Sequence, residues 1–560
     1  LTMAATLVVS FLVALLAVPL LAKSLLRRQE AEAMEVTGAR QERLGSLISN
    51  GLRRTLARPR WLALPLVALA VLGYVGYSHL GSGFMPHMDE GGFIFDYRAA
   101  PGTSLTETDR LVRQVETIIR AMPDVESYSR RTGLQLGGGL TEANEGDLFV
   151  KLKGGNRRPI ETVMSDLRQQ VENRVPGLQV ETAQLMEDLI GDLISNPQPI
   201  EVKLFGPDAG QLRVLGVQIS EAIGKIPGVV EVFDGTTIAG DAIEVKVDRA
   251  QAALEGLDPD AITLQLEQLL GGVVTSQIQA GEKMIGVRVW TDESLRQRIG
   301  QVGALRLRSP NGHYLPLSRV ATVTVAQGQA QQDRDNLRET VRVTGRLEGI
   351  DLGSAMKEVK QTIQKLNLPP GYSVEYGGIF EEQQRSFREL AMVFAAAMLL
   401  VATLLMYLYE RVAIVVSILA TALLTLPGIF IGLWVTGSEL DLSSMMGLTM
   451  VIGIVTEVAI FYFAELDVTG KIGPEDLIDA ARMRLRPILM TSSIAILALM
   501  PLALGLGAGS AMQRPLAITI ISGLLVAVPL VLLVMPALFH AMNRESGFSG
   551  PGQAESSPAH

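Results

Sequence analysis

The sequence contains no cysteine, carries few charges for its length, and lacks the motifs of common soluble enzymes. Without cysteine, the chain has no disulfide framework and no cysteine-based metal or redox site. Charged residues make up 19% of the 560 residues, whereas soluble domains carry roughly 25%. No Walker loop, nucleophile elbow or zinc-binding spacing is present, and the net charge of −9 provides no basic surface for nucleic acid. We therefore exclude a plain cytosolic enzyme and a disordered chain, and expect no cofactor and no nucleic-acid partner.

The charge deficit lies in long apolar runs at both ends of the chain. A membrane-spanning helix needs about 20 mostly apolar residues. Seven stretches meet this requirement: residues 3–22, 61–80, 389–408, 412–435, 442–466, 487–506 and 516–540. The third and fourth are separated only by Tyr409, Glu410 and Arg411, which predicts a tight helical hairpin. The fold class is therefore a polytopic α-helical membrane bundle with a large α+β insert, residues 81–388.

Basic residues predict the orientation of this bundle, because cytoplasmic loops of membrane proteins are enriched in Lys and Arg. Residues 23–60 contain nine Lys or Arg, and Arg482, Arg484 and Arg486 precede the sixth span. Both segments should be cytoplasmic, which places the large insert outside. The chain begins with Leu1 at the outer end of a span, so we expect it to be the C-terminal part of a larger membrane protein. A naturally split subunit is the alternative.

The insert repeats one small unit four times, in which a strand-like run and a helix are followed by a turn and a second strand. The turns are Pro123-Asp124, Pro176-Gly177, Pro227-Gly228 and Pro370-Gly371. Two such units form a ferredoxin-like sandwich. The first pair covers 92–184, and the second, 199–248 with 339–378, is interrupted by an inserted subdomain with a strand pair at 285–290 and 304–308. Unrelated α+β folds are the alternative.

Glu457 is the ionisable residue that stands out within the apolar spans, about midway along the fifth. A charge there costs roughly 2.5–3.5 kcal/mol on insertion scales, and such residues usually mark ion or proton routes. Arg484 and Thr491, at the start of the sixth span, are its candidate partners, seven residues apart and so on one helix face. The alternative for these two is that Arg484 anchors the helix end and the hydroxyl joins helices.

Four motifs resemble the second half of a resistance-nodulation-division (RND) efflux permease. They are Phe84-Met85-Pro86-His87-Met88-Asp89-Glu90-Gly91, Pro199-Ile200-Glu201-Val202-Lys203-Leu204-Phe205-Gly206, Arg484-Leu485-Arg486-Pro487-Ile488-Leu489-Met490-Thr491-Ser492 and Gly507-Ala508-Gly509-Ser510. The third is the most specific, because it resembles the start of the family's eleventh transmembrane helix. The resemblance extends over nearly the whole chain.

The resemblance implies a division of the chain into a membrane part and a periplasmic part. Its segments would be a transmembrane helix (1–22), a cytoplasmic linker (23–60), a second transmembrane helix (61–80), a ferredoxin-like porter subdomain (81–198), a split second porter subdomain (199–248 and 339–385), a docking-type insertion (249–338), five transmembrane helices (386–542) and a disordered cytoplasmic tail (543–560).

The resemblance also implies a function, namely proton antiport by a homotrimer in the bacterial inner membrane. Substrate would leave through a periplasmic adaptor (membrane fusion protein) and an outer-membrane channel. Arg484 and Thr491 match positions of the family's eleventh-helix relay, and the acids of the fourth helix are not in this chain. Glu457 stands where drug exporters usually carry Lys. A Glu at this position is similar to the heavy-metal (copper/silver, cobalt-zinc-cadmium) branch.

The substrate stays open between a small organic compound and a metal cation. The copper/silver branch uses a methionine cluster, but the matching positions here are Glu145, Gly191 and Leu257. Cu(I) needs thioether or thiolate ligands, so we expect no metal site there. Two other functions remain: an RND-like lipid or protein-translocation component, which would lack a docking insertion, and a non-transporting half.

Overall fold

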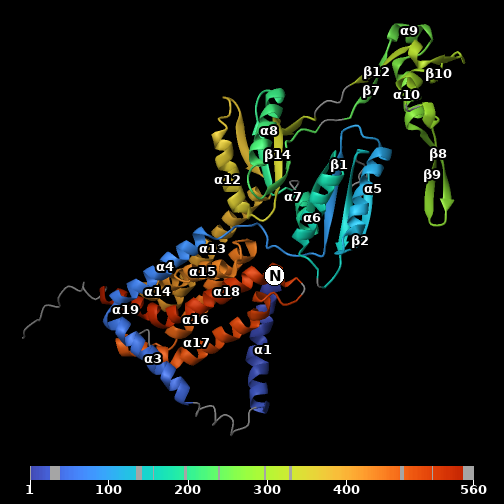
Figure 1. The fold of residues 1–560 in the computed structure, drawn as a ribbon. Coiled ribbons are helices and arrows are strands. Elements are labelled where there is room, and N and C mark those ends of the chain that lie inside the picture. The colour runs from blue at the N-terminus through green and yellow to red at the C-terminus, as the bar shows by residue number, and fades with distance from the viewer. Residues whose placement is uncertain are drawn as a thin grey trace, which may run out of the picture. The chain divides into compact units, whose positions relative to one another are not determined.

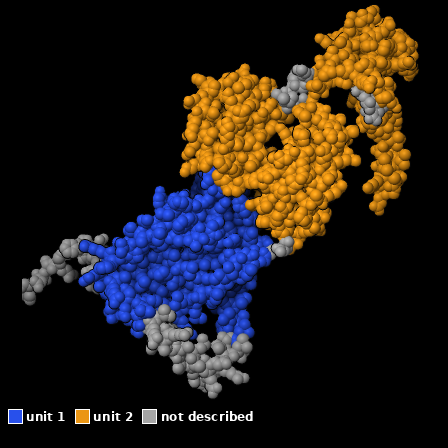
Figure 2. Space-filling model, in the orientation of Figure 1, with its two compact units in different colours: residues 1–88, 351–356, 380–560 blue, residues 89–350, 357–379 orange. Residues whose placement is uncertain are grey.

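A computed structural model describes residues 2–25, 38–133, 142–155, 157–194, 198–237, 240–295, 298–326, 331–466, 472–507 and 509–545. Positions 546–560 of the predicted disordered tail lie outside the described residues. The chain forms two compact units (Figure 2). Unit 1 comprises residues 1–88, 351–356 and 380–560, and unit 2 comprises residues 89–350 and 357–379.

Unit 1 is helical (Figure 1). Its helices are α1 (Thr2–Leu25), α3 (Gly38–Ala57), η1 (Pro59–Leu62), α4 (Ala63–Ser78), α13 (Ile379–Tyr409), α14 (Val412–Leu423), α15 (Leu426–Thr436), α16 (Leu442–Phe463), α17 (Pro474–Ala503), α18 (Ser510–Pro529), the π-helical turn η5 (Leu530–Val534) and α19 (Met535–Glu545). Helix α18 lies at the centre, because it packs against α15, α16 and α17.

Six stretches of unit 1 are long and apolar enough to cross a membrane: Arg60–Ser78, Ile379–Tyr409, Val412–Thr436, Leu442–Phe463, Pro474–Ala503 and Ser510–Asn543. They correspond to six of the seven predicted spans. The first predicted span lies in helix α1, where the apolar part among the described residues, Val8–Leu21, is shorter than a span. The predicted hairpin is present: α13 ends at Tyr409, α14 begins at Val412, and Glu410 adopts a left-handed φ of 52°.

Glycine allows helix α4 to approach α15 closely. A Cβ added at Gly73 would lie 2.4 Å from the Cβ of Pro427, and one at Gly76 would lie 3.1 Å from the carbonyl oxygen of Phe430. Small residues at helix interfaces are typical of membrane proteins, where backbones approach closely and van der Waals packing replaces the hydrophobic effect. The α4–α15 interface therefore depends on the absence of a side chain at Gly73.

The first half of unit 2 is a four-stranded antiparallel sheet with two helices. The chain order is β1 (Gly92–Ala99), α5 (Leu105–Ala121), β2 (Val125–Thr132), β3 (Glu145–Leu152), α6 (Ile160–Arg174) and β4 (Leu178–Gln184), and the sheet order is β2-β3-β1-β4. Buried residues of β1, β3 and both helices form one core, which includes Phe93, Phe95, Val115 and Leu167. Helix α7 (Leu185–Ile194) follows β4 and packs on β1 and β4.

The second half repeats the arrangement in two separated pieces. The first piece is β5 (Ile200–Phe205), α8 (Ala209–Ile223) and β6 (Val229–Phe233), and the second is β13 (Asp333–Asp335), β14 (Arg338–Leu347), α12 (Leu352–Lys365) and β15 (Ser373–Gly377). The sheet order is β13-β14-β5-β15, with β6 paired to β14. The predicted Pro-Gly turns hold, since Gly177, Gly228 and Gly371 all have φ between 86° and 90°.

The inserted subdomain starts earlier than the sequence predicts. Strand β7 (Ala242–Val247) was expected to belong to the second sandwich, but it pairs with β12 (Ala321–Ala326) in a separate ribbon. Its other elements are α9 (Arg249–Leu254), α10 (Pro259–Leu266), η2 (Glu267–Gly271), β8 (Val273–Ala280), β9 (Lys283–Val289), η3 (Glu293–Leu295), α11 (Ile299–Gly303), β10 (Arg306–Arg308), β11 (Tyr314–Pro316) and η4 (Leu317–Arg319).

The predicted pairing of 285–290 with 304–308 is wrong. Strand β9 pairs with β8 across the two-residue turn Gly281-Glu282, and β10 pairs with β11. Gly281 has a φ of 64°, and short turns that contain a residue with positive φ favour hairpins between neighbouring strands. Each of these four strands therefore pairs with its nearest neighbour along the chain.

We predict that Gly73→Val destabilises unit 1, because the added side chain overlaps Pro427 and overpacking of an interior costs roughly 1–3 kcal/mol. The measurement is thermal unfolding of the detergent-solubilised chain. Gly45→Val in α3 is the control, since a Cβ there meets only the side chain of Arg482 at 3.9 Å. Equal unfolding temperatures for the two variants would contradict the packing described.

Candidate functional site

Helix α16, which carries Glu457, begins at a well-formed N-cap. The Asp441 carboxylate accepts a hydrogen bond from the Ser444 backbone N–H at 2.7 Å, and the Ser444 hydroxyl oxygen accepts one from the Asp441 N–H at 2.8 Å. This reciprocal pair satisfies two backbone donors at the start of the helix. It fixes where α16 starts and therefore which residues face the bundle.

Glu457 lies on the exposed face of α16. Val455, Ala459 and Tyr462 are fully buried on the opposite face. The exposed stripe, with helical spacing, consists of Met446, Met450, Gly453, Glu457 and Phe461. No hydrogen bond or ion pair joins Glu457 to another residue within the part of the chain that the structure describes. A lone carboxyl group thus occupies the middle of an otherwise apolar helical stripe.

Arg484 does not reach Glu457. Its Nη2 lies 2.6 Å from Oε2 of Glu465, and both side chains are about one-third exposed. Glu465 follows Glu457 by eight residues, or about 12 Å of helix rise. The structure therefore assigns Arg484 a carboxylate partner near the end of α16, and sequence reasoning missed that partner because it treated Glu465 as part of an apolar span.

Thr491 is exposed on α17, and its hydroxyl donates to the carbonyl oxygens of Pro487 and Ile488, both at 3.1 Å. The neighbouring Ser492 is buried instead. Its hydroxyl, like those of Thr456 on α16 and Thr519 on α18, has no hydrogen-bond partner among the described residues. Buried polar groups are normally satisfied, so these three hydroxyls lack a partner that buried hydroxyls usually have. The structure thus separates Thr491 from the buried hydroxyls.

Asp441 is a second acid that sequence reasoning missed. Its side chain is 1% exposed, and its Oδ2 has no hydrogen-bond partner in the described chain. Burial above all, opposed by hydrogen bonds from Ser444 and reinforced by the nearby Glu439 carboxylate, raises the pKa of Asp441 to about 6. The signal was the capping pattern Asp441-Leu442-Ser443-Ser444 just before an apolar run.

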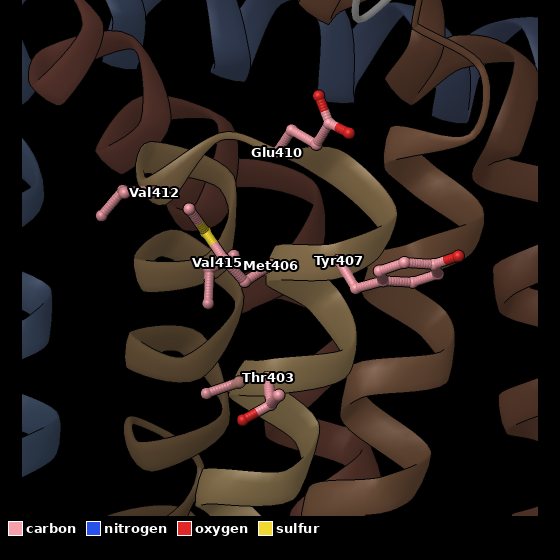
Figure 3. Close-up of a pocket in the computed structure, with 7 residues that line it drawn as sticks. Thr403, Met406, Tyr407, Glu410, Val412 and Val415 are labelled. Atoms are coloured by element: carbon pink, nitrogen blue, oxygen red, sulfur yellow. The ribbon is translucent and has the colours of Figure 1, made fainter.

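A hollow of about 580 Å3 opens at the hairpin between α13 and α14 (Figure 3). It is lined by Ala402, Thr403, Met406, Tyr407, Glu410, Val412 and Val415. Glu410 is the one lining residue with a carboxyl or basic side chain, and none of Glu457, Arg484 and Thr491 belongs to this lining. The hollow is therefore a surface feature separate from the predicted relay.

The positions that match the methionine cluster are not grouped into a soft metal site. Glu145 forms an ion pair with Arg98 at 2.7 Å, and Leu257 is buried in the core of the inserted subdomain. His87 lies 3.4 Å from Glu439. Among the described residues, no group of three or more His, Cys, Asp or Glu is arranged to hold a metal ion.

The comparisons with known proteins decide the family. The model of the AcrB/AcrD/AcrF family matches residues 1–543. The chain belongs to this family. The predicted resemblance to an RND permease, closer to the heavy-metal branch, is thereby confirmed by the relatives and the solved structures.

Relatives from both branches of RND transporters are similar to the chain. The cobalt-zinc-cadmium resistance protein CzcA of Cupriavidus metallidurans is 27% identical over 521 residues, which are 90% of this chain and 49% of CzcA. The multidrug resistance protein MdtC of Pectobacterium carotovorum is 25% identical over 552 residues, 96% of this chain and 53% of MdtC. A crystal structure of a heavy metal efflux pump superposes with a TM-score of 0.77 at 27% identity, covering 90% of this chain and 53% of that one. The chain spans about half the length of these relatives.

We predict that Asp441→Asn removes a pH-dependent loss of stability. Since the folded state holds the proton of Asp441 up to about pH 6 and the unfolded chain releases it near 3.8, the free energy of unfolding falls as pH rises between these values and stays lower above them. Asn also caps helices well. Above pH 6, the free energy of unfolding of the variant should therefore exceed that of the wild type by up to ~3 kcal/mol. The measurement is thermal unfolding across this pH range.

Asp441→Ala is the control, because it removes the cap as well as the charge and should destabilise the chain on both sides of the titration. If the difference between Asp441→Asn and the wild type is the same at low and high pH, the carboxyl group does not titrate as described.

Proposed function

We propose that this chain supplies one half of an RND permease that exports substrate by proton antiport, with Glu457 as the group that takes up and releases the proton. The observation that carries the proposal is the position of Glu457, midway along α16 on an exposed apolar stripe without a partner among the described residues. An ionisable group facing lipid is costly, and in membrane proteins such groups face protein or a water path.

We therefore expect the stripe around Glu457 to contact protein or a water path in place of lipid. The relatives are about twice as long as this chain, and the remaining half of their length is long enough to provide further transmembrane helices. We infer that the stripe of Met446, Met450, Gly453 and Glu457 packs against those helices, and that acids there complete the relay. Arg484, held by Glu465, and Thr491 would lie beside that contact on α17.

The two sandwiches of unit 2 are, in this proposal, ferredoxin-like porter subdomains. Their chain order of two βαβ units fits that fold, as do the sheet order β2-β3-β1-β4 of the first and the order β6-β14-β5-β15 within the second. The subdomain between β7 and β12 would then be the docking element, which meets a periplasmic adaptor and an outer-membrane channel in a homotrimeric pump of the bacterial inner membrane. The insertion also favours a tripartite exporter over a lipid or protein-translocation component.

Two observations favour a metal cation as substrate. Glu457 stands at a position where drug exporters usually carry Lys, and relatives such as CzcA are named for cobalt, zinc and cadmium resistance. The absence of a methionine cluster favours harder or borderline divalent ions over Cu(I), because Cu(I) prefers sulfur ligands. The similarity to MdtC keeps an organic compound as the second substrate class to be tested.

Protonation of Glu457 would supply the energy for export. One charge that crosses 100 mV releases about 2.3 kcal/mol. That energy can bias helices between two discrete packings. Helix α13 runs without interruption for 31 residues from Ile379 to Tyr409 and is the direct covalent link from β15 to the bundle. It is therefore one of the chain segments through which a shift of the bundle would reach unit 2.

We predict that Glu457→Gln in the intact transporter abolishes export, because the amide cannot exchange a proton, while assembly stays near normal. The measurement is substrate-induced proton release in everted inner-membrane vesicles, with Zn²⁺, Co²⁺ or Cd²⁺ added in one arm and a cationic dye in the other. Glu410→Gln, at the exposed hairpin, is the matched control and should transport normally. Full proton coupling in Glu457→Gln would overturn the assignment, and a response to the dye alone would overturn the metal substrate.

A further inference from the structure

The second sandwich of unit 2 contains a local distortion where β6 pairs with β14. The register shifts between Thr344 and Arg346, so that Arg346 pairs with Val230 and Thr344 with Phe233. Glu231, inside this irregular stretch, has a φ of 51°, which is uncommon for a residue other than glycine. Bulges re-aim side chains, and strained backbone is kept where the surroundings hold it in place. The distortion therefore sets the directions of the Glu231 and Arg346 side chains, and the surrounding structure holds it in place.

Arg346 carries a buried positive charge to the first sandwich. Its side chain is 5% exposed. Nη1 lies 2.9 Å from Oε1 of Glu187 on α7, and Nη2 lies 3.8 Å from Oε2 of Glu181 on β4. Its Nε lies 3.4 Å from Oε2 of Glu231 on its own sandwich. One guanidinium group thus contacts carboxylates from both halves of unit 2.

Glu231 also contacts the first sandwich, with a negative charge in place of the positive charge of Arg346. Its carboxylate accepts hydrogen bonds from the backbone N–H of Thr182 at 3.1 Å and from the Thr182 hydroxyl at 2.8 Å. It also pairs with Arg168 of α6 at 3.2 Å, and Arg168 pairs in turn with Glu348 of the second sandwich. The Glu231 side chain is 1% exposed. Charged groups from β6 and β14 therefore reach into the β4, α6 and α7 surface of the first sandwich.

Negative charge is in excess around Arg346. Asp96 on β1 is half-buried, and its pKa is raised to about 7 by desolvation and by the carboxylates of Asp188 and Glu181, while Arg346 acts in the opposite direction. The carboxylates from β1, β4, α7 and β6 outnumber the two guanidinium groups of Arg168 and Arg346. Removal of Arg346 would leave these carboxylates to repel one another across the contact.

We propose that Arg346 and Glu231 form a latch that holds the two sandwiches of unit 2 together and that opens when the sandwiches move apart. Buried ion pairs contribute little net stability compared with apolar packing, but breaking one by removing a partner is strongly unfavourable. Such a contact therefore adds little to the stability of a permanent interface. It is well suited to an interface that has two discrete states. That the opening accompanies transport rests on the proposed function, whereas the latch itself does not.

The test is a distance measurement between spin labels in the otherwise cysteine-free chain. Exposed positions Thr117 on α5 and Gln218 on α8 are changed to cysteine and labelled, one in each sandwich. In Arg346→Met we expect the ratio of separated to closed molecules to rise roughly tenfold, equivalent to ~1.4 kcal/mol. Glu231→Gln keeps the volume and should shift the ratio in the same direction.

Arg110→Met is the matched control, because it removes an exposed ion pair with Glu107 within α5 and should leave the distances unchanged. Hydrogen exchange of β1 and β5 reports whether each sandwich remains folded. Unchanged distances in Glu231→Gln or in Arg346→Met, with both sandwiches protected, would overturn the latch. Since the readout is a distance, the result stands whether or not Glu457→Gln abolishes export.

Discussion

The constraint on which this structure depends is the cost of placing a carboxyl group among hydrocarbon. Glu457 interrupts an apolar stripe on α16 whose other members are methionine, glycine and phenylalanine. A charge in that position is tolerated when protein or water covers it. The close packing elsewhere in unit 1, with glycines at the α4–α15 contact and the capping pair at the start of α16, fixes which face of α16 is left for such a cover.

The charged groups of the two units are arranged in opposite ways. In unit 1 the described residues near Glu457 provide no counter-charge, and Arg484 is held about two helical turns away by Glu465. In unit 2 the opposite holds, because Arg346 and Arg168 are surrounded by carboxylates from several elements. We propose that Glu457 in unit 1 binds a proton, and that the ion pairs of Arg346 and Arg168 in unit 2 hold its two sandwiches in one of two positions.

Features fixed by local chemistry were predictable from the sequence. The hairpin at Glu410 and the turns at Gly177, Gly228 and Gly371 follow from short-range signals, and apolar length alone indicated six of the helices. Features fixed by tertiary contact were not. The pairing of β7 with β12 joins segments about 80 residues apart, and the Arg484–Glu465 contact depends on where α16 ends, which hydropathy does not resolve. Asp441 was hidden for the same reason, since its burial comes from packing around the helix start.

The most direct test of the account is infrared difference spectroscopy of the complete transporter in lipid after a pH jump. The account predicts a carboxyl C=O band that appears on protonation, shifts when glutamate is labelled with ¹³C, and is absent in Glu457→Gln while the remaining bands persist. An identical set of carboxyl bands in the wild type and in Glu457→Gln would show that the proton binds elsewhere, and would contradict the central claim.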